Sequence, residues 1–184
     1  MRSAILAGML LAVAHTAAAQ TPAAQTPAAQ TPAAGAPVLP ATDVTANDTK
    51  KFIDNLPKDA ISDLPIRQVE VGPNHRIGVY GVFRPKSQPG DAIAHETRTA
   101  EVYYILEGAG VLVTGGKIMD MKPPPAGRNA GPRGDRIDGG VSRRVSAGDV
   151  IIIPGRTPHW WSSLDTDIRY LIFRPDPEGL QPIK

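Results

Sequence analysis

The sequence predicts an all-β fold, an antiparallel β-barrel preceded by one short helix. Beyond Pro65 the chain consists of short runs rich in Val, Ile and Tyr, which Gly and Pro interrupt. These runs are IRQVEV, HRIGVYGVF, VYYILEG, GVLVTGG, GVSRRVSAGDVIIIP, HWWSS and IRYLIFRP. Several short strands with closely spaced turn signals are typical of a sandwich or barrel. The length of 184 residues, 41% of them hydrophobic, suits one globular domain with tails.

The first 19 residues have the layout of a cleaved secretory signal peptide, which we place at residues 1–19. Arg2 precedes an apolar run from about Ala4 to Val13, and three alanines before Gln20 offer a cleavage site. The run is shorter than the roughly 20 apolar residues that span a bilayer, so we expect no membrane span in the mature chain. The sequence therefore predicts a secreted or periplasmic protein. Because it contains no cysteine, the fold must hold without disulfides.

A linker and a helical extension are expected before the barrel. Residues 20–42 contain the pentapeptide Gln-Thr-Pro-Ala-Ala three times and keep a bias to Pro and Ala, which predicts a disordered tether. Within residues 43–66, Asn47 or Asp48 could cap a short helix through TKKFIDNL, and Pro57 ends it. Its apolar residues lie on one side, so we expect it to pack on the outside of the barrel domain, residues 67–184.

One segment, residues 117–140, interrupts the strand pattern. It is dense in Pro, Gly and Arg and too long for a tight turn. It is therefore either a flexible insertion or a lid over a site, and the insertion is the simpler interpretation.

His95 and Glu101 stand close together in the stretch HETRTAEVYYILEG. On one continuous strand, a rise of about 3.3 Å per residue would hold them roughly 20 Å apart. They can share a ligand only if the chain reverses between them, and the short polar residues there could form a hairpin connection. His159 also stands beside a reversal, after a Pro-Gly turn. Two hairpin ends could thus bring all three side chains to one point inside a barrel.

The stretch HETRTAEVYYILEG, with His95 and Glu101, and the stretch GDVIIIPGRTPHWW, with His159, resemble the two signature motifs of the cupin superfamily. The resemblance covers about residues 67 to 175. In the first motif His95, Glu101 and Gly108 match, and Thr97 stands in place of a second histidine. Gly90 lies one residue too close to the histidine. The chain is identified as similar to small single-domain cupins of the type-2 kind, here with a secretion signal.

The second motif matches at Gly148, Pro154 and His159. Gly155 is shifted by one place, and Ser163 stands where Asn is usual. What the resemblance implies is a small jelly-roll barrel that holds a metal ion through the motif residues His95, Glu101 and His159.

The residue types agree with that implication. Two imidazoles and one carboxylate leave coordination positions open, which suits Fe(II) and is tolerated by Zn, Mn, Ni or Cu, so we expect one divalent ion of open identity. A carboxylate at the mouth of a buried strand would be costly without a partner, which favours a ligand role for Glu101. His75 shares a strand face with Ile77, Val79 and Phe83. It should then point into the barrel as a candidate fourth ligand, although a hydrogen-bonded core histidine is the simpler interpretation.

Strand alternation also predicts which neighbours face the site. If Glu101 and His159 point into the barrel, alternation places Tyr103, Trp161 and Ser163 on the same inward faces of their strands. We assign these three residues to substrate binding. Tyr104 and Trp160 would point outward. That apolar pair, together with the family resemblance, predicts a homodimer.

The function expected from these features is that of an exported metal-binding cupin acting on a small organic molecule by oxygenase-type or isomerase-type chemistry. No residue is assigned as a catalytic acid or base. The alternative is a non-catalytic module that binds a small ligand or a metal, and a third reading is a metal-free structural barrel. The net charge of +2 arises without a basic block, so nucleic-acid binding is not favoured.

Overall fold

The computed structural model describes residues 40–123 and 131–180. The described residues contain one helix and twelve strands. In chain order they are α1 (Ala46–Asp54), β1 (Ser62–Gly72), β2 (His75–Arg84), β3 (Ala92–Ile93), β4 (Glu101–Glu107), β5 (Ala109–Thr114), β6 (Lys117–Met119), β7 (Arg133–Gly134), β8 (Arg136–Asp138), β9 (Val141–Ser146), β10 (Val150–Ile153), β11 (His159–Leu164) and β12 (Ile168–Asp176). The all-β prediction with a short N-terminal helix is confirmed.

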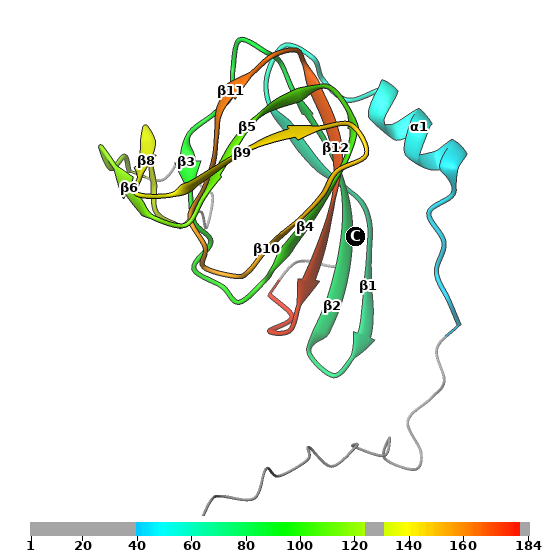
Figure 1. Ribbon diagram of the computed structural model, residues 1–184. Helices are drawn as coiled ribbons and strands as arrows, with labels where there is room; N and C mark the ends of the chain where they lie inside the picture. The colour runs from blue at the N-terminus through cyan, green and yellow to red at the C-terminus, as the bar shows by residue number, and fades with distance from the viewer. Residues whose placement is uncertain (1–39, 124–130, 181–184) are drawn as a thin grey trace, which may run out of the picture. The chain divides into compact units, whose positions relative to one another are not determined.

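Ten of the twelve strands form two five-stranded sheets that face each other as a barrel (Figure 1), and β6 and β8 form a separate two-stranded sheet. The first sheet has the order β1-β2-β12-β4-β10, and the second has the order β7-β3-β11-β5-β9. All their pairings are antiparallel. Strands that are consecutive in the sequence often belong to different sheets. β4 and β10 belong to the first sheet, and the strands that follow them, β5 and β11, belong to the second.

The main core lies between the two sheets, where alternate side chains of each strand point inward. Its members are large and apolar: Tyr80, Val82, Tyr103, Ile105, Leu112, Val145, Ile151, Ile153, Trp161, Leu164, Ile168, Tyr170 and Ile172. This core explains how the chain can fold without disulfides.

Helix α1 packs on the outer face of the first sheet, as expected. Its N-cap is Thr45, whose hydroxyl oxygen accepts a hydrogen bond from the backbone N–H of Asp48 at 3.1 Å. The expected cap at Asn47 or Asp48 was therefore wrong, because the helix begins earlier, at Ala46. Ile53 and other apolar residues of this region pack against Phe83 of β2.

That packing reverses the facing predicted for β2. Tyr80 and Val82 point into the core between the sheets, whereas Phe83 lies on the outer face under α1. Both faces of β2 are apolar because the helix covers one of them, so alternation could not tell inside from outside. His75, predicted to point inward, is exposed at the turn between β1 and β2.

The boundaries of the barrel also differ from the expectation. β1 begins at Ser62, before residue 67, and pairs along its length with β2. The predicted signal peptide and residues 20–39 of the predicted linker lie outside the described residues, and residues 40–42 are exposed. Within the described ranges, no helix has the length and hydrophobicity that crossing a membrane requires.

The segment 117–140 is partly built of strands. β6 and β8 pair with each other and project as an arm beside β3 (Figure 1), and β7 pairs with β3. Residues 124–130 lie outside the described residues, so the choice between insertion and lid stays open.

The arm changes the surroundings of Trp160. Its ring is half-buried against the cluster that contains Ile118 and Ile137, and its Nε1 donates to the carbonyl oxygen of Gly90 at 3.2 Å. Tyr104 is 41% exposed but belongs to the other sheet. The single outward patch on which the homodimer was predicted therefore does not form.

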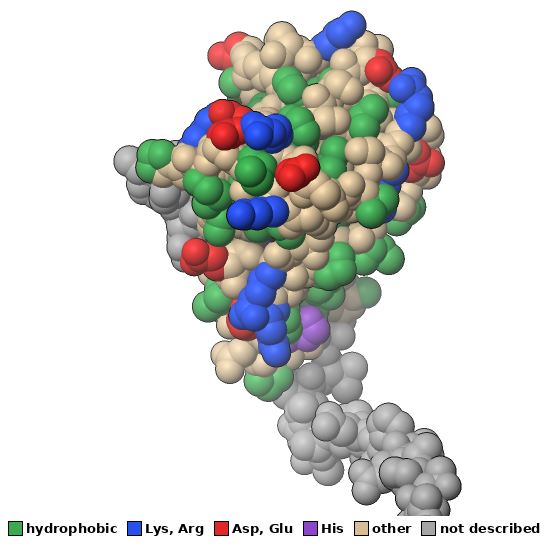
Figure 2. Space-filling view, turned by 60° about the vertical axis from the view of Figure 1, so that its left-hand side comes forward, with side chains coloured by type: hydrophobic (Ala, Val, Ile, Leu, Met, Phe, Trp, Pro, Cys, Tyr) green, Lys and Arg blue, Asp and Glu red, His purple; other side chains and the backbone are tan. Residues whose placement is uncertain are grey.

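On the face shown in Figure 2, basic and acidic side chains are interspersed, and neither sign forms a patch of its own.

Candidate metal centre

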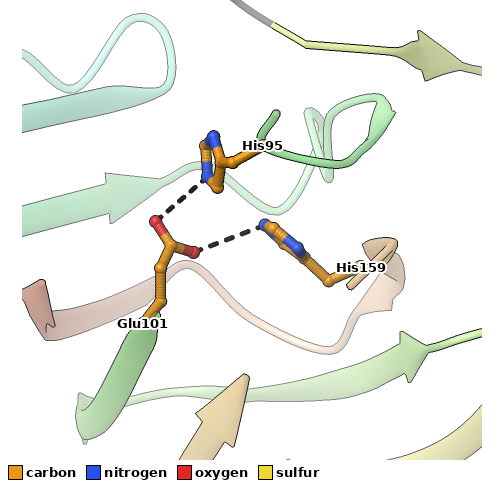
Figure 3. A group of neighbouring side chains, drawn as sticks. All are labelled: His95, Glu101 and His159. Carbon is orange, nitrogen blue, oxygen red and sulfur yellow. Dashed lines mark hydrogen bonds and ion pairs between the residues drawn. The ribbon is translucent and has the colours of Figure 1, made fainter. Parts of the chain in front are cut away.

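Three elements bring His95, Glu101 and His159 together. Glu101 opens β4 in the first sheet, His159 opens β11 in the second, and His95 follows β3, also in the second. The cluster thus bridges the two sheets. Figure 3 shows the two imidazoles, each facing one oxygen of the Glu101 carboxylate. The expected hairpin between His95 and Glu101 was wrong: the chain between them crosses from one sheet to the other, because β3 and β4 have different partners.

The three side chains converge closely. Nε2 of His95 lies 3.2 Å from Oε1 of Glu101, and Nε2 of His159 lies 3.4 Å from Oε2. One ligand atom from each residue lies within 4.8 Å of the other two. Glu101 and His159 are 2% and 4% exposed, whereas the side chain of His95 is 35% exposed. The cluster is therefore closed on the Glu101 and His159 side and open beside His95.

The tautomer of His159 follows from its backbone contact. Nδ1 lies 3.0 Å from the carbonyl oxygen of Thr157, and a carbonyl can only accept, so Nδ1 carries the hydrogen. A neutral ring then has a bare lone pair on Nε2. That atom is buried and lacks hydrogen-bond geometry to any described residue, although it lies near the Glu101 carboxylate.

A bare nitrogen facing a carboxylate oxygen needs a positive charge between them. Burial lowers the pKa of His159 below its usual range, although Glu101 acts in the opposite direction, so a proton is disfavoured there. A metal cation would satisfy both groups, and the backbone bond at Nδ1 is the usual support for a metal-bound imidazole. The residues present therefore fit a divalent ion.

Glu101 is held by two further donors. Nε of Arg174 donates to Oε1 at 2.7 Å, and the hydroxyl of Tyr103 donates to Oε2 at 2.9 Å. Burial alone would raise the pKa of Glu101, but the charge of Arg174 and the two histidines hold it well below its usual range. Glu101 is thus a fixed anion, with one lone pair on each oxygen left to face the imidazoles.

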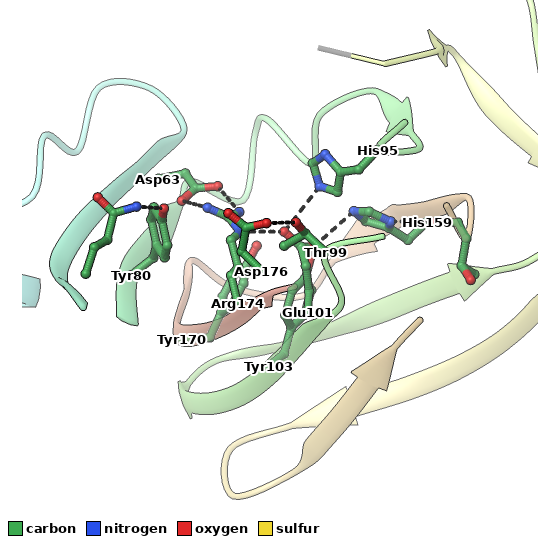
Figure 4. Close-up of polar contacts among 12 residues, drawn as sticks. Asp63, Tyr80, His95, Thr99, Glu101, Tyr103, His159, Tyr170, Arg174 and Asp176 are labelled. Atoms are coloured by element: carbon green, nitrogen blue, oxygen red, sulfur yellow. Dashed lines mark hydrogen bonds and ion pairs between the residues drawn. The ribbon is translucent and has the colours of Figure 1, made fainter. Parts of the chain in front are cut away.

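Arg174 continues the network away from the cluster. Its Nη1 and Nη2 donate to the two carboxylate oxygens of Asp63 at 3.1 Å and 2.6 Å, and its guanidinium stacks on the ring of Tyr80 at 4.2 Å (Figure 4). Such bidentate pairing fixes the guanidinium in one orientation. Asp63, Arg174 and Glu101 therefore form one charge-paired row that ends at the metal cluster.

Sequence reasoning missed Arg174, although a signal was present. Along β12, Tyr170 and Ile172 point into the core, and alternation places Arg174 on the same face. A charged residue at an inward position requires a buried partner, and Glu101 is the candidate that alternation already placed inside.

The other predicted site residues are placed as follows. Tyr103 and Trp161 are each 2% exposed in the core, and Tyr103 contacts Glu101 directly. Ser163 is exposed, because the pairing of β11 with β5 shifts register between Trp161 and Ser163. Its predicted inward position was therefore wrong. His75 was likewise wrong as an inward residue, and it does not belong to the cluster found in the described residues.

Comparison with known proteins gives likeness of fold. No family model and no curated protein matches the chain. The solved structure of BH2720 from Bacillus halodurans is 14% identical, with 78% of this chain and 86% of that chain covered at a TM-score of 0.47. An rmlc-like cupin protein from Desulfovibrio desulfuricans is 17% identical, with 65% and 84% covered at a TM-score of 0.39.

A third similar structure is the DMSP lyase DddQ from Ruegeria pomeroyi. It is 20% identical, with 67% of this chain and 50% of that chain covered at a TM-score of 0.41. The present chain is built on two facing antiparallel sheets, with a cluster of two histidines and one glutamate between them.

Proposed function

We propose that this chain is an exported cupin that binds one divalent metal ion through His95, Glu101 and His159 and acts on a small organic molecule. The observation that carries the proposal is the bare Nε2 of His159, buried 3.4 Å from a carboxylate oxygen of Glu101. Neither atom has a hydrogen for the other, so a cation between them removes an unfavourable contact.

A bound ion with open positions would supply Lewis-acid or redox chemistry to a coordinated small molecule. The chain's own residues divide the remaining tasks. Arg174 and Tyr103 hold Glu101 as an oriented anion, which suits a ligand and not a proton donor. His95 forms the open side, so a small molecule would approach past its partly exposed ring.

The alternative function is a non-catalytic module that binds a metal or small ligand. Two features favour it. The guanidinium of Arg174 already neutralises part of the charge that Glu101 would offer to a cation, and Thr97 supplies no imidazole where the resembling family has one. Both features would lower affinity for the ion, which suits reversible binding.

Export rests on the N-terminal sequence, which lies outside the described residues. The proposal predicts a mature chain that begins near Gln20 and appears in the periplasm or medium. Mass spectrometry of the protein recovered from those fractions tests it, and a full-length chain retained in the cytoplasm would contradict it.

Metal content tests the site. The protein and its variants are loaded in turn with Fe(II), Mn(II), Ni(II), Cu(II) and Zn(II), desalted and measured by inductively coupled plasma mass spectrometry. Wild-type protein should retain one equivalent of at least one ion, whereas His159→Gln and Glu101→Gln should retain little. His75→Gln is the matched control, because it removes an exposed histidine outside the cluster.

Equal retention by the wild type and His159→Gln would refute the metal proposal. Thr97→His provides a test in the opposite direction, because a third imidazole should tighten binding. Oxygen consumption or isomerisation by the loaded protein with a panel of small organic acids and sugars then separates the catalytic function from the binding module.

A further inference from the structure

A cavity of about 730 Å3 lies between the start of β1, the end of β2 and β3. The residues that matter for its chemistry are Ile61, Asp63, Arg84, Gly90, Asp91 and Arg133. His95, Glu101 and His159 do not line it. It is therefore separate from the metal cluster, although Asp63 belongs to its wall and also to the charge-paired row that ends at Glu101.

Both carboxylates of the cavity wall are already paired. Asp63 accepts two hydrogen bonds from Arg174. Asp91 accepts a hydrogen bond from Nζ of Lys122 at 2.9 Å and lies 3.5 Å from Nη1 of Arg133. The negative charge of the wall is thus taken up by neighbouring cations.

Arg84 has no such partner. Its Nε donates to the hydroxyl oxygen of Tyr170 at 2.9 Å and its Nη1 to the carbonyl oxygen of Pro89 at 2.6 Å, and both acceptors are neutral. Among the described residues, no carboxylate forms an ion pair with Arg84. Burial disfavours its charged form, but Tyr170 and, to a smaller extent, Tyr103 and the Asp63 carboxylate together outweigh that effect, so the pKa of Arg84 is raised and the side chain is a cation.

A second donor in the wall is also unsatisfied. Nε of Arg133 is buried and has no hydrogen-bond partner among the described residues. Buried polar groups are nearly always hydrogen-bonded, and buried charges are nearly always paired. Arg84 therefore has a charge without an ion-pair partner among the described residues, and Arg133, although paired with Asp91, has a donor that they do not use.

We infer that this cavity binds a small anion, the carboxylate or phosphate group of a small molecule, with Arg84 as its anchor and Arg133 as a second donor. The planar guanidinium suits both kinds of oxyanion, because its paired N–H groups match two oxygens. The site adds a ligand chemistry that the metal cluster does not specify, and it stands independently of the metal proposal.

The backbone holds the anchor in place. Gly90 has φ of 93°, and a Cβ there would lie 2.5 Å from Nη1 of Arg84 and 3.0 Å from Cδ1 of Ile61. The positive φ favours glycine, and the absence of a Cβ leaves room for the guanidinium against the loop. Arg84 is therefore fixed from one side by Gly90 and from the other by Tyr170.

The proximity of Ile61 permits a direct test. Ile61 is 37% exposed, so a polar side chain is tolerated there. Ile61→Glu would place a carboxylate beside Arg84 and supply the missing counter-ion from within the chain. Ile61→Gln has the same shape without the charge and is the matched control.

The experiment measures the melting temperature of the full-length, chelator-treated protein in phosphate, in acetate and in chloride of matched ionic strength. The metal is removed because an anion that coordinates a bound metal ion would also raise the melting temperature, and this effect would be mistaken for binding in the cavity. At about a hundredfold excess over Kd, phosphate, acetate or both should raise the melting temperature of the wild type by roughly 5 to 10 °C in a saturable way. A response to one anion alone identifies the group.

The response should vanish in Arg84→Gln and in Ile61→Glu. It should persist in Ile61→Gln and in Arg143→Gln, which changes an exposed arginine of β9 that does not line the cavity. If Arg84→Gln fails to fold, the two Ile61 variants decide. No saturable response in the wild type, or an undiminished response in Ile61→Glu, would overturn the inference. Loss of the metal site in the separate loading experiment leaves this outcome unaffected.

Discussion

Arg174 and Glu101 lie directly across from each other on neighbouring strands, with Nε of the arginine 2.7 Å from Oε1 of the glutamate. Phe173 of β12 pairs with Val102 of β4 in antiparallel register, so Arg174, which follows Phe173, lies opposite Glu101, which precedes Val102. The side chains are 12% and 2% exposed. The candidate metal ligand is thus one half of a buried ion pair that the strand register creates.

We predict that Arg174→Met strongly destabilises the protein. The change leaves the carboxylates of Glu101 and Asp63 without their common partner, and breaking a buried pair in this way costs about 3–5 kcal/mol. Urea unfolding followed by tryptophan fluorescence measures the loss.

Arg169→Met is the matched control for that prediction. Arg169 lies on the same strand, but its partner Glu107 is 64% exposed, so its ion pair contributes no more than about 1 kcal/mol. Equal losses in the two variants would show that the Arg174 pair contributes no more than a surface pair.

Local alternation accounts for the part of the site that the sequence could predict. Glu101, Tyr103, His159 and Trp161 are all buried, and Tyr104 is exposed, because the facing of a residue relative to its neighbours is a property of the strand itself. The spacing of the motifs also pointed to the right three residues for the cluster.

The predictions that were wrong concern pairing and packing between segments that are far apart in the sequence. The choice of sheet for β3 and β4 determines that His95 and Glu101 meet across the barrel and not across a hairpin. The irregular pairing of β11 turned Ser163 outward, and the packing of α1 reversed the facing of β2 and of His75. None of these pairings leaves a local pattern in the chain.

Stability of the metal-free protein should fall in two steps as the pH is lowered. The pKa of His159 in the folded protein is below 6.5, the usual value of a histidine in an unfolded chain. Below pH 6.5 the unfolded chain therefore binds a proton at this residue before the folded protein does. The free energy of unfolding falls as the pH is lowered toward the pKa of the folded protein. The pKa of Glu101 is well below 4.5, so its contribution is present above that pH and is lost as pH falls toward the folded value.

Urea midpoints measured across this range in the presence of a chelator check both steps. His159→Gln should remove the upper step and leave the lower one. An unchanged upper step in that variant would assign the effect to another group.

Gly108 and Gly148, which both match glycines of the resembling motifs, should differ in their tolerance of alanine. Both have positive φ, of 88° and 91°. A Cβ at Gly108 would lie 2.2 Å from the carbonyl oxygen of Asp167, whereas nothing lies within 4 Å of one at Gly148. Gly148→Ala should therefore cost only the backbone strain, about 1 kcal/mol, and Gly108→Ala clearly more, because the start of β12 must move. Equal urea midpoints for the two variants would contradict this.

Tyr103→Phe should weaken metal binding although Tyr103 is not placed among the ligands. Its hydroxyl donates to Oε2 of Glu101 at 2.9 Å and, with Arg174, fixes the orientation of the carboxylate. Loss of such a supporting hydrogen bond typically lowers metal affinity by about 10-fold to 100-fold, and the same loss should cost about 1 kcal/mol of folding stability. Competition with a chromophoric chelator for Zn(II) measures the metal affinity, and urea unfolding measures the folding stability.

Tyr104→Phe is the control, because that neighbouring ring is exposed on the opposite face of β4. Should Tyr103→Phe bind Zn(II) as tightly as Tyr104→Phe while losing stability, the hydroxyl would serve only the folding of the buried network, and the orientation of Glu101 would rest on Arg174 alone.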